Sequence, residues 1–298
     1  MLADFYSLCT TPIRLVKADG RVANGSGFFY SCTTGDGGSL LCLVTNYHAL
    51  AGSSPKRNRP QPGGKIQFEI HLSAQDPHKV RTVNYPLQFS SGKSSWFGSP
   101  LFPAADIAFV PLPSSLFEGV QGFRFLDDGS VDSGLDSYPG QPVSIVGYPL
   151  GFADPRQHLP IWKTGHLASE PELDFGGEPN LLVHVAGRTG MSGAPALVGH
   201  RDIYQPRLGA PRAAASGKLL GIYSSVIADG RGAVPIEPLV SLEEAEDVPD
   251  LAPPPGDRYL ELGVIWKGSL VKATLASFQH SFLKGEVLDK VSTQDALW

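Results

Sequence analysis

Short apolar runs separated by glycine and proline are the feature of this sequence that most restricts its fold. Of the 298 residues, 34 are glycine and 26 are proline, and both residue types disfavour long helices. The segment 65–72 (KIQFEIHL) gives the complementary signal, because its four apolar residues alternate with polar ones. A period of two is typical of a strand with one buried face. The sequence therefore predicts an all-β protein and argues against a helical bundle.

Strands are expected along the whole chain, with one helix near the C-terminus. In the helix segment, Val271, Leu275, Phe278 and Phe282 share one face after Ser269, the expected N-cap. We expect this helix to pack on the β structure. The expected strands are 12–18, 25–32, 39–45, 65–72, 106–110, 142–147, 161–169, 180–186, 194–198, 218–226 and 260–267.

The length allows one large β domain or two packed β-barrels. If there are two barrels, we expect a first barrel subdomain over residues 1–135 and a second over 136–283, which ends with the helix. The stretch 227–258 is rich in proline and acidic residues, so it is expected to be an insertion between strands of the second barrel. Residues 284–298 form a tail, expected to be a disordered terminus or a segment that docks on a partner.

Charge and hydropathy argue against several classes of protein. A net charge of −5 gives no overall basic surface for nucleic acid. No run approaches the length of about 18 apolar residues that a membrane helix needs. Residues 1–15 lack a basic segment followed by a sustained apolar run, so no signal peptide is expected. We therefore expect a cytoplasmic protein that binds neither nucleic acid nor membrane.

The cysteines and histidines do not indicate a metal. Cys9, Cys32 and Cys42 are odd in number and include no C-x-x-C pair, so we expect buried, reduced thiols. The eight histidines show no H-E-x-x-H or similarly close spacing, which argues against a metal hydrolase. No metal or other cofactor is expected.

The sharpest local motif is GMSGAP at residues 190–195. Because glycine accepts unusual dihedral angles, a tight turn here can direct the N–H groups of Gly190 and Ser192 toward an oxyanion. Two further sequence segments contain side chains that could act with this serine. His48 directly follows an apolar strand, and Asp106 begins an apolar run where a charge is costly unless it is paired.

In the chain order His48, Asp106, Ser192, these motifs resemble those of the chymotrypsin-fold (PA clan) serine peptidases. The likeness is greatest to trypsin-like peptidases of the bacterial cytosolic and HtrA type. It implies an all-β fold of two six-stranded antiparallel barrels with a C-terminal α-helix. The motifs that carry the resemblance are GSGFF (25–29), TNYH (45–48), DIA (106–108), VGYP (146–149) and GMSGAP (190–195).

The resemblance also implies a role for each residue. Ser192 would attack a peptide carbonyl, His48 would transfer the proton, and Asp106 would orient the imidazole. Gly190 and Ser192 would supply the N–H groups of the oxyanion hole. Ser224 stands where family members carry a serine that binds the catalytic aspartate. A serine endopeptidase acting on proteins or peptides through an acyl-enzyme is therefore expected.

Substrate preference and regulation follow from the same alignment. It places Ala186 near the base of the pocket for the residue before the scissile bond (P1), with Tyr223 and Val226 in positions to narrow it. Since none of these residues is charged, we expect a small or medium-sized apolar P1 residue. Met191 replaces the aspartate that secreted digestive members use for zymogen activation. Regulation by a separate protein partner is a hypothesis motivated by this difference and by the acidic insertion.

Two other interpretations compete with this one. An α/β-hydrolase would use G-x-S-x-G, but Ala194 occupies the last position, and that fold's residue order would require His200 or His280 as the base. The other is a dormant or non-catalytic module built on the protease fold. The sequence leaves this second alternative open, because it does not fix the loop geometry.

Overall fold

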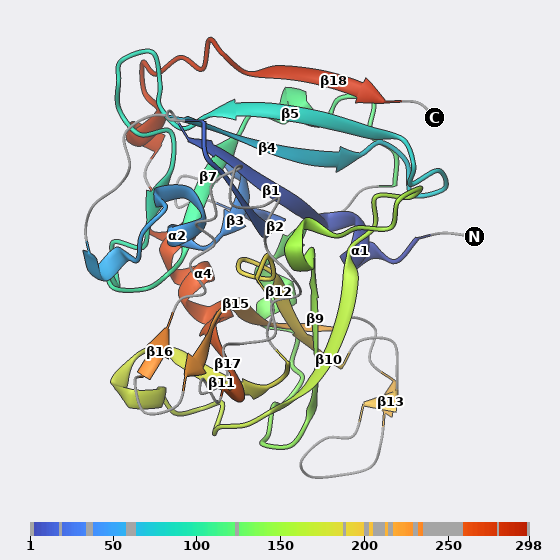
Figure 1. Ribbon diagram of the computed structural model, residues 1–298, viewed down its shortest axis with the longest axis vertical. Helices are drawn as coiled ribbons and strands as arrows, with labels where there is room; N and C mark the ends of the chain where they lie inside the picture. Colours follow the sequence, from blue (N-terminus) through green and yellow to red (C-terminus); the bar gives the residue numbers. More distant parts are fainter. Residues whose placement is uncertain are drawn as a thin grey trace.

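A computed structural model describes residues 3–17, 20–33, 38–57, 64–122, 125–186, 189–199, 203–204, 212–213, 217–228, 232–234, 259–278 and 280–296. Within these ranges the chain forms two large, mainly antiparallel β-sheets, one small β-hairpin and a few short helices (Figure 1). The expected all-β, chymotrypsin-like fold is confirmed.

The first sheet is built mainly from the N-terminal half of the chain. Its strands follow the order β18-β5-β4-β1-β2-β3-β7-β6, and β8 pairs with β2. The alternation at 65–72 has the expected cause, since Ile66, Phe68 and Ile70 face the core. The strands are β1 (Thr10–Lys17), β2 (Val22–Thr33), β3 (Ser39–Thr45), β4 (Gly64–His71), β5 (Val80–Pro86), β6 (Phe97–Gly98), β7 (Ala108–Leu112), β8 (Leu126–Asp127) and β18 (Ser292–Ala296).

The second sheet closes on itself. Its order is β12-β9-β10-β11-β17-β15-β16, and β15 also pairs with β12, so six strands form a closed barrel. A separate hairpin joins β13 (Ile203–Tyr204) and β14 (Arg212–Ala213). The strands of the second sheet are β9 (Pro142–Gly147), β10 (Ile161–Leu167), β11 (Asn180–His184), β12 (Pro195–Val198), β15 (Lys218–Ala228), β16 (Gly232–Val234) and β17 (Tyr259–Lys267).

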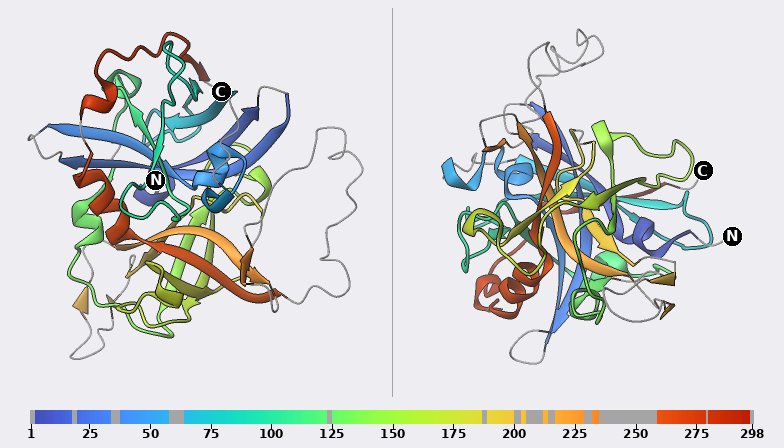
Figure 2. Two further views of the ribbon diagram at one scale, coloured as in Figure 1. Left: turned by 90° about the vertical axis from the view of Figure 1, so that its left-hand side faces the viewer. Right: turned by 90° about the horizontal axis from the view of Figure 1, so that it is seen from below.

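The described residues form three apolar cores, one against the first sheet, one inside the closed barrel of the second sheet and one between the two sheets. The core between the barrels receives Leu270, Val271 and Leu275 from α4, so the helix packs on the β structure as expected. Figure 2 (left) shows α4 at the shared edge of the two sheets. The helices are α1 (Phe5–Cys9), α2 (Tyr47–Ala51), α3 (Asp128–Val131) and α4 (Gly268–Ala276), and the 3₁₀ turns are η1 (Pro55–Arg57), η2 (Ser114–Phe117), η3 (Pro149–Gly151), η4 (Phe175–Gly177) and η5 (His280–Leu283).

The ends of the C-terminal helix differ from the prediction. The N-cap is Lys267 rather than Ser269, which lies inside the first turn. The helix ends at Ala276, and the chain continues through η5, so Phe278 and Phe282 are not part of α4. Both rings nevertheless pack against Phe97, at centroid distances of 5.1 and 5.2 Å. The spacing therefore correctly indicated that these apolar residues pack against the rest of the protein, but they lie on two short segments instead of one helix.

The tail was expected to be a disordered terminus or a segment that docks on a partner, and over residues 292–296 the structure shows an ordered strand. Strand β18 pairs antiparallel with β5, from Ser292 opposite Asn84 to Ala296 opposite Val80 (Figure 1). Most of the expected insertion 227–258 lies outside the described residues. Its first residues belong to β15, and 232–234 form β16.

Residues Cys9, Cys32 and Cys42 are buried, as expected for structural thiols. Burial raises the pKa of Cys32 to about 11, so this thiol stays protonated near neutral pH. No helix among the described residues is long and apolar enough to cross a membrane. Over the same ranges, no cluster of three His, Cys, Asp or Glu residues could hold a metal ion.

Candidate active site

His48 and Asp106 meet at the end of the first barrel. Strand β3 ends at Thr45, and His48 lies in the short helix α2 that follows it. Asp106 accepts two hydrogen bonds from this residue, one from the His48 N–H to Oδ1 (2.9 Å) and one from ring Nδ1 to Oδ2 (2.6 Å). Asn46 fixes the aspartate backbone, because its Nδ2 donates to the Asp106 carbonyl at 2.6 Å.

The charge of Asp106 determines the state of the histidine ring. Burial alone would raise the pKa of Asp106, but the His48 ring and hydrogen bonds from His48 and Ser224 outweigh it and hold the pKa below its usual value. An ionised carboxylate only accepts hydrogen bonds, so His48 Nδ1 carries a proton. In the neutral ring, Nε2 is therefore the basic atom.

Ser224 links the aspartate to the candidate nucleophile. Its hydroxyl donates to Asp106 Oδ2 at 2.6 Å, and its carbonyl accepts a hydrogen bond from Ser192 Oγ at 3.0 Å. Because a hydroxyl has a single proton, that of Ser192 points toward Ser224 in this structure. Transfer of the proton to His48 requires rotation about the Ser192 Cβ–Oγ bond.

The loop that carries Ser192 depends on two glycines. Gly190 and Gly193 have φ values of +89° and +91°, which favour glycine. A Cβ on Gly193 would overlap the Ser26 carbonyl oxygen and the Thr45 hydroxyl. Within the described residues, the N–H groups of Gly190 and Ser192 donate no hydrogen bond in the protein. They are therefore available to a negatively charged oxygen, as an oxyanion hole requires.

Ser26 on β2 connects the first barrel to this loop. Its N–H donates to the Ser192 carbonyl (2.8 Å), and its hydroxyl donates to the Gly190 carbonyl (2.7 Å). The same hydroxyl accepts the N–H of Tyr148 at 2.9 Å. Sequence reasoning used GSGFF only as a strand motif and missed this role. The available signal was a serine between two glycines in an apolar strand.

The three expected pocket residues have different surroundings. Tyr223 is only 1% exposed, and its ring fills the space beside Gly263 in the second barrel. Its backbone holds the nucleophile loop, donating to the Ala194 carbonyl (2.9 Å) and accepting the Gly193 N–H (2.8 Å). Val226 is buried further along β15, whereas Ala186 is exposed just beyond β11.

The hydroxyl of Tyr223 is buried and has no hydrogen-bond partner among the described residues. Burial raises the pKa of this phenol, so it is neutral near pH 7.

Comparisons with known proteins agree with the fold. The model of the trypsin-like peptidase domain matches residues 25–201, more than half of the chain. No curated protein matches the sequence.

Similar solved structures include an inactive form of Rv3671c from M. tuberculosis H37Rv, at 15% identity and a TM-score of 0.44, with 95% of this chain and 90% of that chain covered. The thermostable serine protease AL20 from an extremophilic microorganism is 14% identical, with a TM-score of 0.45 and coverage of 92% and 97%. Protease Anisep from Arthrobacter nicotinovorans is 13% identical, with a TM-score of 0.40 and coverage of 93% and 99%.

Proposed function

Because the chain belongs to the trypsin-like peptidase domain family, we propose that it is a serine endopeptidase whose catalytic residues are His48, Asp106 and Ser192. The observation that carries the proposal is the continuous set of hydrogen bonds from the His48 ring to Asp106, from Ser224 to Asp106, and from Ser192 to Ser224. All four residues are at most 7% exposed, so water does not screen these contacts strongly.

The proposed reaction has two stages. Ser192 Oγ attacks the peptide carbonyl while His48 Nε2 accepts its proton, and His48 then donates that proton to the leaving amine. Asp106 stabilises the imidazolium, and the N–H groups of Gly190 and Ser192 bind the developing oxyanion. Loss of one such donor typically lowers the rate about 10²–10³-fold. Water then hydrolyses the acyl-enzyme by the same proton transfers in reverse order.

The orientation of the Ser192 hydroxyl is a modest obstacle to this reaction. A neutral hydrogen bond of the kind it makes to Ser224 contributes about 0.5–1.5 kcal/mol net. The need to break it therefore lowers the fraction of molecules in which the Ser192 hydroxyl can transfer its proton to His48 by at most about tenfold. The bond is compatible with an active enzyme, and it is also the observation that favours the second candidate, a dormant protease-fold module.

We infer that the P1 residue is small or medium-sized and apolar. The support is the Tyr223 ring, which occupies barrel space next to Gly263, and the apolar surroundings contributed by Val226. A large P1 side chain would have to displace a buried tyrosine. A cytoplasmic location and a regulatory protein partner stay predictions from the sequence.

Digestion of an unfolded, carboxymethylated protein tests the proposed function. The wild type is expected to produce internal cleavages that mass spectrometry can locate, and Ser192→Ala is expected to produce none. Ser95→Ala is the matched control, since Ser95 is a buried serine whose hydroxyl donates to the Pro86 carbonyl and to no other group among the described residues. Cleavage that survives in Ser192→Ala would contradict the proposal. If the wild type binds the carboxymethylated protein but does not cleave it, the dormant module is favoured.

A further inference from the structure

Gly190, whose N–H is proposed to bind the oxyanion, packs on the backbone of the turn that follows β9. A Cβ on Gly190 would lie 2.5 Å from the Tyr148 carbonyl oxygen and 2.6 Å from the Leu150 nitrogen. The Leu150 N–H also donates to the Thr189 carbonyl at 2.7 Å. The position of this turn therefore determines where the Gly190 N–H lies.

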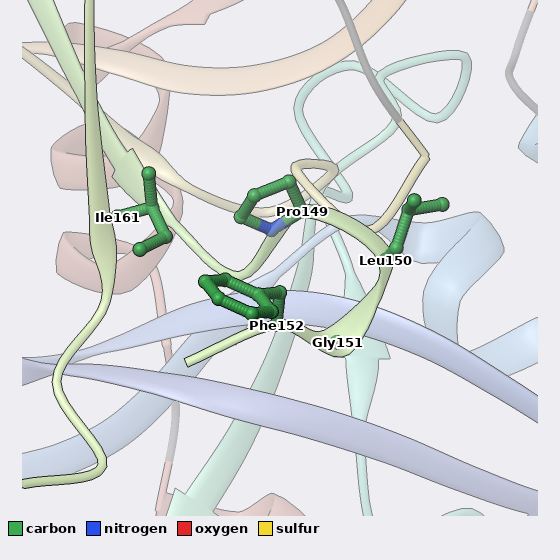
Figure 3. Close-up of a pocket in the computed structure, with 5 residues that line it drawn as sticks. All are labelled: Pro149, Leu150, Gly151, Phe152 and Ile161. Carbon is green, nitrogen blue, oxygen red and sulfur yellow. The ribbon is translucent and has the colours of Figure 1, made fainter. Parts of the chain in front are cut away.

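The side chains of the turn do not fix its position. Leu150 is 67% exposed, Phe152 is 62% exposed, and no residue of η3 is buried. Figure 3 shows the Phe152 ring next to Pro149, with Ile161 of β10 facing them and Leu150 at the other end of the turn, around an open pocket of about 680 Å³. Apolar side chains stabilise a segment in proportion to the area that they remove from water. The turn therefore depends on contacts made by the residues on either side of it.

Tyr148 holds the first end of the turn against the first barrel. It is fully buried, and its N–H donates to the Ser26 hydroxyl, which also binds the Gly190 carbonyl. Its own hydroxyl lies within hydrogen-bond distance of two carbonyl oxygens, that of Thr10 on β1 (3.3 Å) and that of His158 (3.1 Å). This phenol therefore joins β1 to both ends of the segment 148–158.

His158 holds the other end of the segment in an uncommon conformation. Its φ is +56°, a left-handed value that few residues other than glycine adopt. Its N–H donates to the Asp154 carbonyl at 2.9 Å, and ring Nδ1 lies 3.1 Å from Oε2 of Glu69 on β4. Strained residues persist where their surroundings over-determine them, and they cluster at functional sites. The contact with Glu69 joins this strained residue to the first barrel.

Glu69 is itself fixed by β1. Its N–H donates to the Thr11 hydroxyl at 2.9 Å, and the same hydroxyl donates to the Glu69 carbonyl at 2.8 Å. Thr11 directly follows Thr10, whose carbonyl faces the Tyr148 hydroxyl. The Glu69 and His158 side chains are both partly buried, so water screens their contact only in part. Neighbouring residues of β1 thus support both ends of the segment.

We propose that Glu69 and His158 are positioning residues, which hold the segment 148–158 against the first barrel and thereby keep the Gly190 N–H directed at the oxyanion. The inference rests on the proposed peptidase function and adds a second connection from the first barrel to that of Ser26. Because every substrate forms an oxyanion, the effect of this pair is the same for a peptide and for a small ester.

A peptide and a p-nitrophenyl ester with the same acyl group test the proposal. His158→Gly removes the ring, and glycine accepts the φ of residue 158. We expect this variant to lower kcat/KM by about tenfold for both substrates, a part of the 10²–10³-fold, roughly, that loss of an oxyanion donor costs. Glu69→Ala is expected to have the same effect. The double variant is expected to lose no more than either single one, because both changes remove the same contact.

Glu69→Gln is the conservative variant, since its amide oxygen accepts a hydrogen bond from His158 Nδ1. It is expected to keep kcat/KM within about twofold of the wild type for both substrates. His184→Ala is the matched control. His184 Nε2 lies 3.4 Å from Glu261 Oε2, but both side chains belong to the second barrel and are more than half exposed. This control is expected to change neither rate.

Urea titration shows whether each variant is folded in the assay. Wild-type rates in folded His158→Gly and Glu69→Ala would overturn this inference alone. A loss confined to the peptide would also overturn it, because the segment would then contact the substrate instead of placing the oxyanion donor. If His158→Gly does not fold, equal rates in Glu69→Ala and Glu69→Gln would overturn the inference. Absence of wild-type hydrolysis of both substrates would overturn the proposed function, and this inference with it.

Discussion

At the scale of single residues, Ser26 shows that the candidate site depends on more than the three side chains proposed as catalytic. It is fully buried and holds the carbonyls of Gly190 and Ser192, which bracket the turn of the nucleophile loop. The loop that presents the nucleophile is therefore fixed from the opposite barrel. Ser26 touches no reacting atom, so we regard it as a positioning residue.

Replacing Ser26 with alanine is expected to lower kcat/KM by about tenfold or more. The change leaves the Tyr148 N–H and the Gly190 carbonyl without the hydroxyl that binds both. Each buried polar group that loses its hydrogen-bond partner destabilises the folded protein by about 1–3 kcal/mol. Peptide kinetics and urea unfolding measure the two effects. Ser95→Ala should lose stability without losing kcat/KM. Equal kinetics for Ser26→Ala and wild type would refute the positioning role.

Tyr223→Ala is expected to change the P1 preference from small or medium apolar residues to large ones such as Phe. Removing the ring opens the space beside Gly263, while the backbone bonds of residue 223 to the nucleophile loop remain. A library of peptides that differ only at P1 gives the preference as a ratio of kcat/KM values, expected to shift by about tenfold. If the variant keeps the wild-type ranking, Tyr223 does not limit the P1 pocket.

The sequence motifs predicted site residues that are in contact in the structure. His48, Asp106 and Ser224 are joined by hydrogen bonds, although 58 and 118 positions separate Asp106 from the other two in the chain. Their catalytic roles stay predictions. The contribution of Ser26 was missed, because its partners are backbone atoms of the opposite barrel and the local sequence shows only a serine between two glycines.

At the scale of elements, several strands rich in apolar residues were predicted well and the polar strand β18 was not. The bounds of β3 and β9 agree with the expected ranges 39–45 and 142–147. β5 and β18 were missed, since β18 (STQDA) is polar and its order comes from pairing with β5 rather than from burial. Such an edge strand depends on its neighbour, so its sequence alone does not mark it.

Two variants test how much the contacts between β18 and β5 stabilise the protein. Arg81 Nε and Nη2 bind the two carboxylate oxygens of Asp295, at 2.7 and 3.0 Å, and its Nη1 also donates to the carbonyls of Leu116 and Glu118. We expect Asp295→Ala to lower the free energy of unfolding by less than about 1 kcal/mol. We expect Arg81→Ala to lower the free energy of unfolding more, by about 1–3 kcal/mol, because it also removes the hydrogen-bond donor of the Leu116 and Glu118 carbonyls. Urea titration measures both, and a larger loss for Asp295→Ala would contradict this assignment.

At the scale of the whole molecule, the two barrels share a core and are also joined at the N-terminus. The shared core contains residues of both barrels, such as Phe28 and Ile222, together with α4. In α1, the Tyr6 hydroxyl accepts the Gly217 N–H at 2.7 Å. The Ser7 hydroxyl also accepts a hydrogen bond from Trp162 Nε1, at 2.8 Å. The family resemblance predicted two barrels, but it did not predict these contacts between segments that are far apart in the sequence.

His71 makes the stability of the protein depend on pH. Burial lowers its pKa to about 4, against the weaker effect of its hydrogen bond to the Pro77 carbonyl. Since an unfolded histidine has a pKa near 6.5, the unfolded chain binds more protons between pH 6.5 and 4. The free energy of unfolding therefore falls with falling pH, by about 2 kcal/mol between pH 7 and pH 5 from this residue. Urea titrations of wild type and His71→Gln test this. The variant should lack that part of the decrease, and identical pH dependences would contradict the assignment.

The central claim is that Ser192 is a nucleophile activated by His48 and Asp106. Labelling with a fluorophosphonate, followed by mass spectrometry, tests it most directly, because the reagent reacts with activated serines without needing the right peptide. We expect the label on Ser192 in the wild type, no label in Ser192→Ala, and labelling of His48→Ala slowed by at least about 10³-fold. An unlabelled wild type, a label on another serine, or an undiminished rate in His48→Ala would contradict the account.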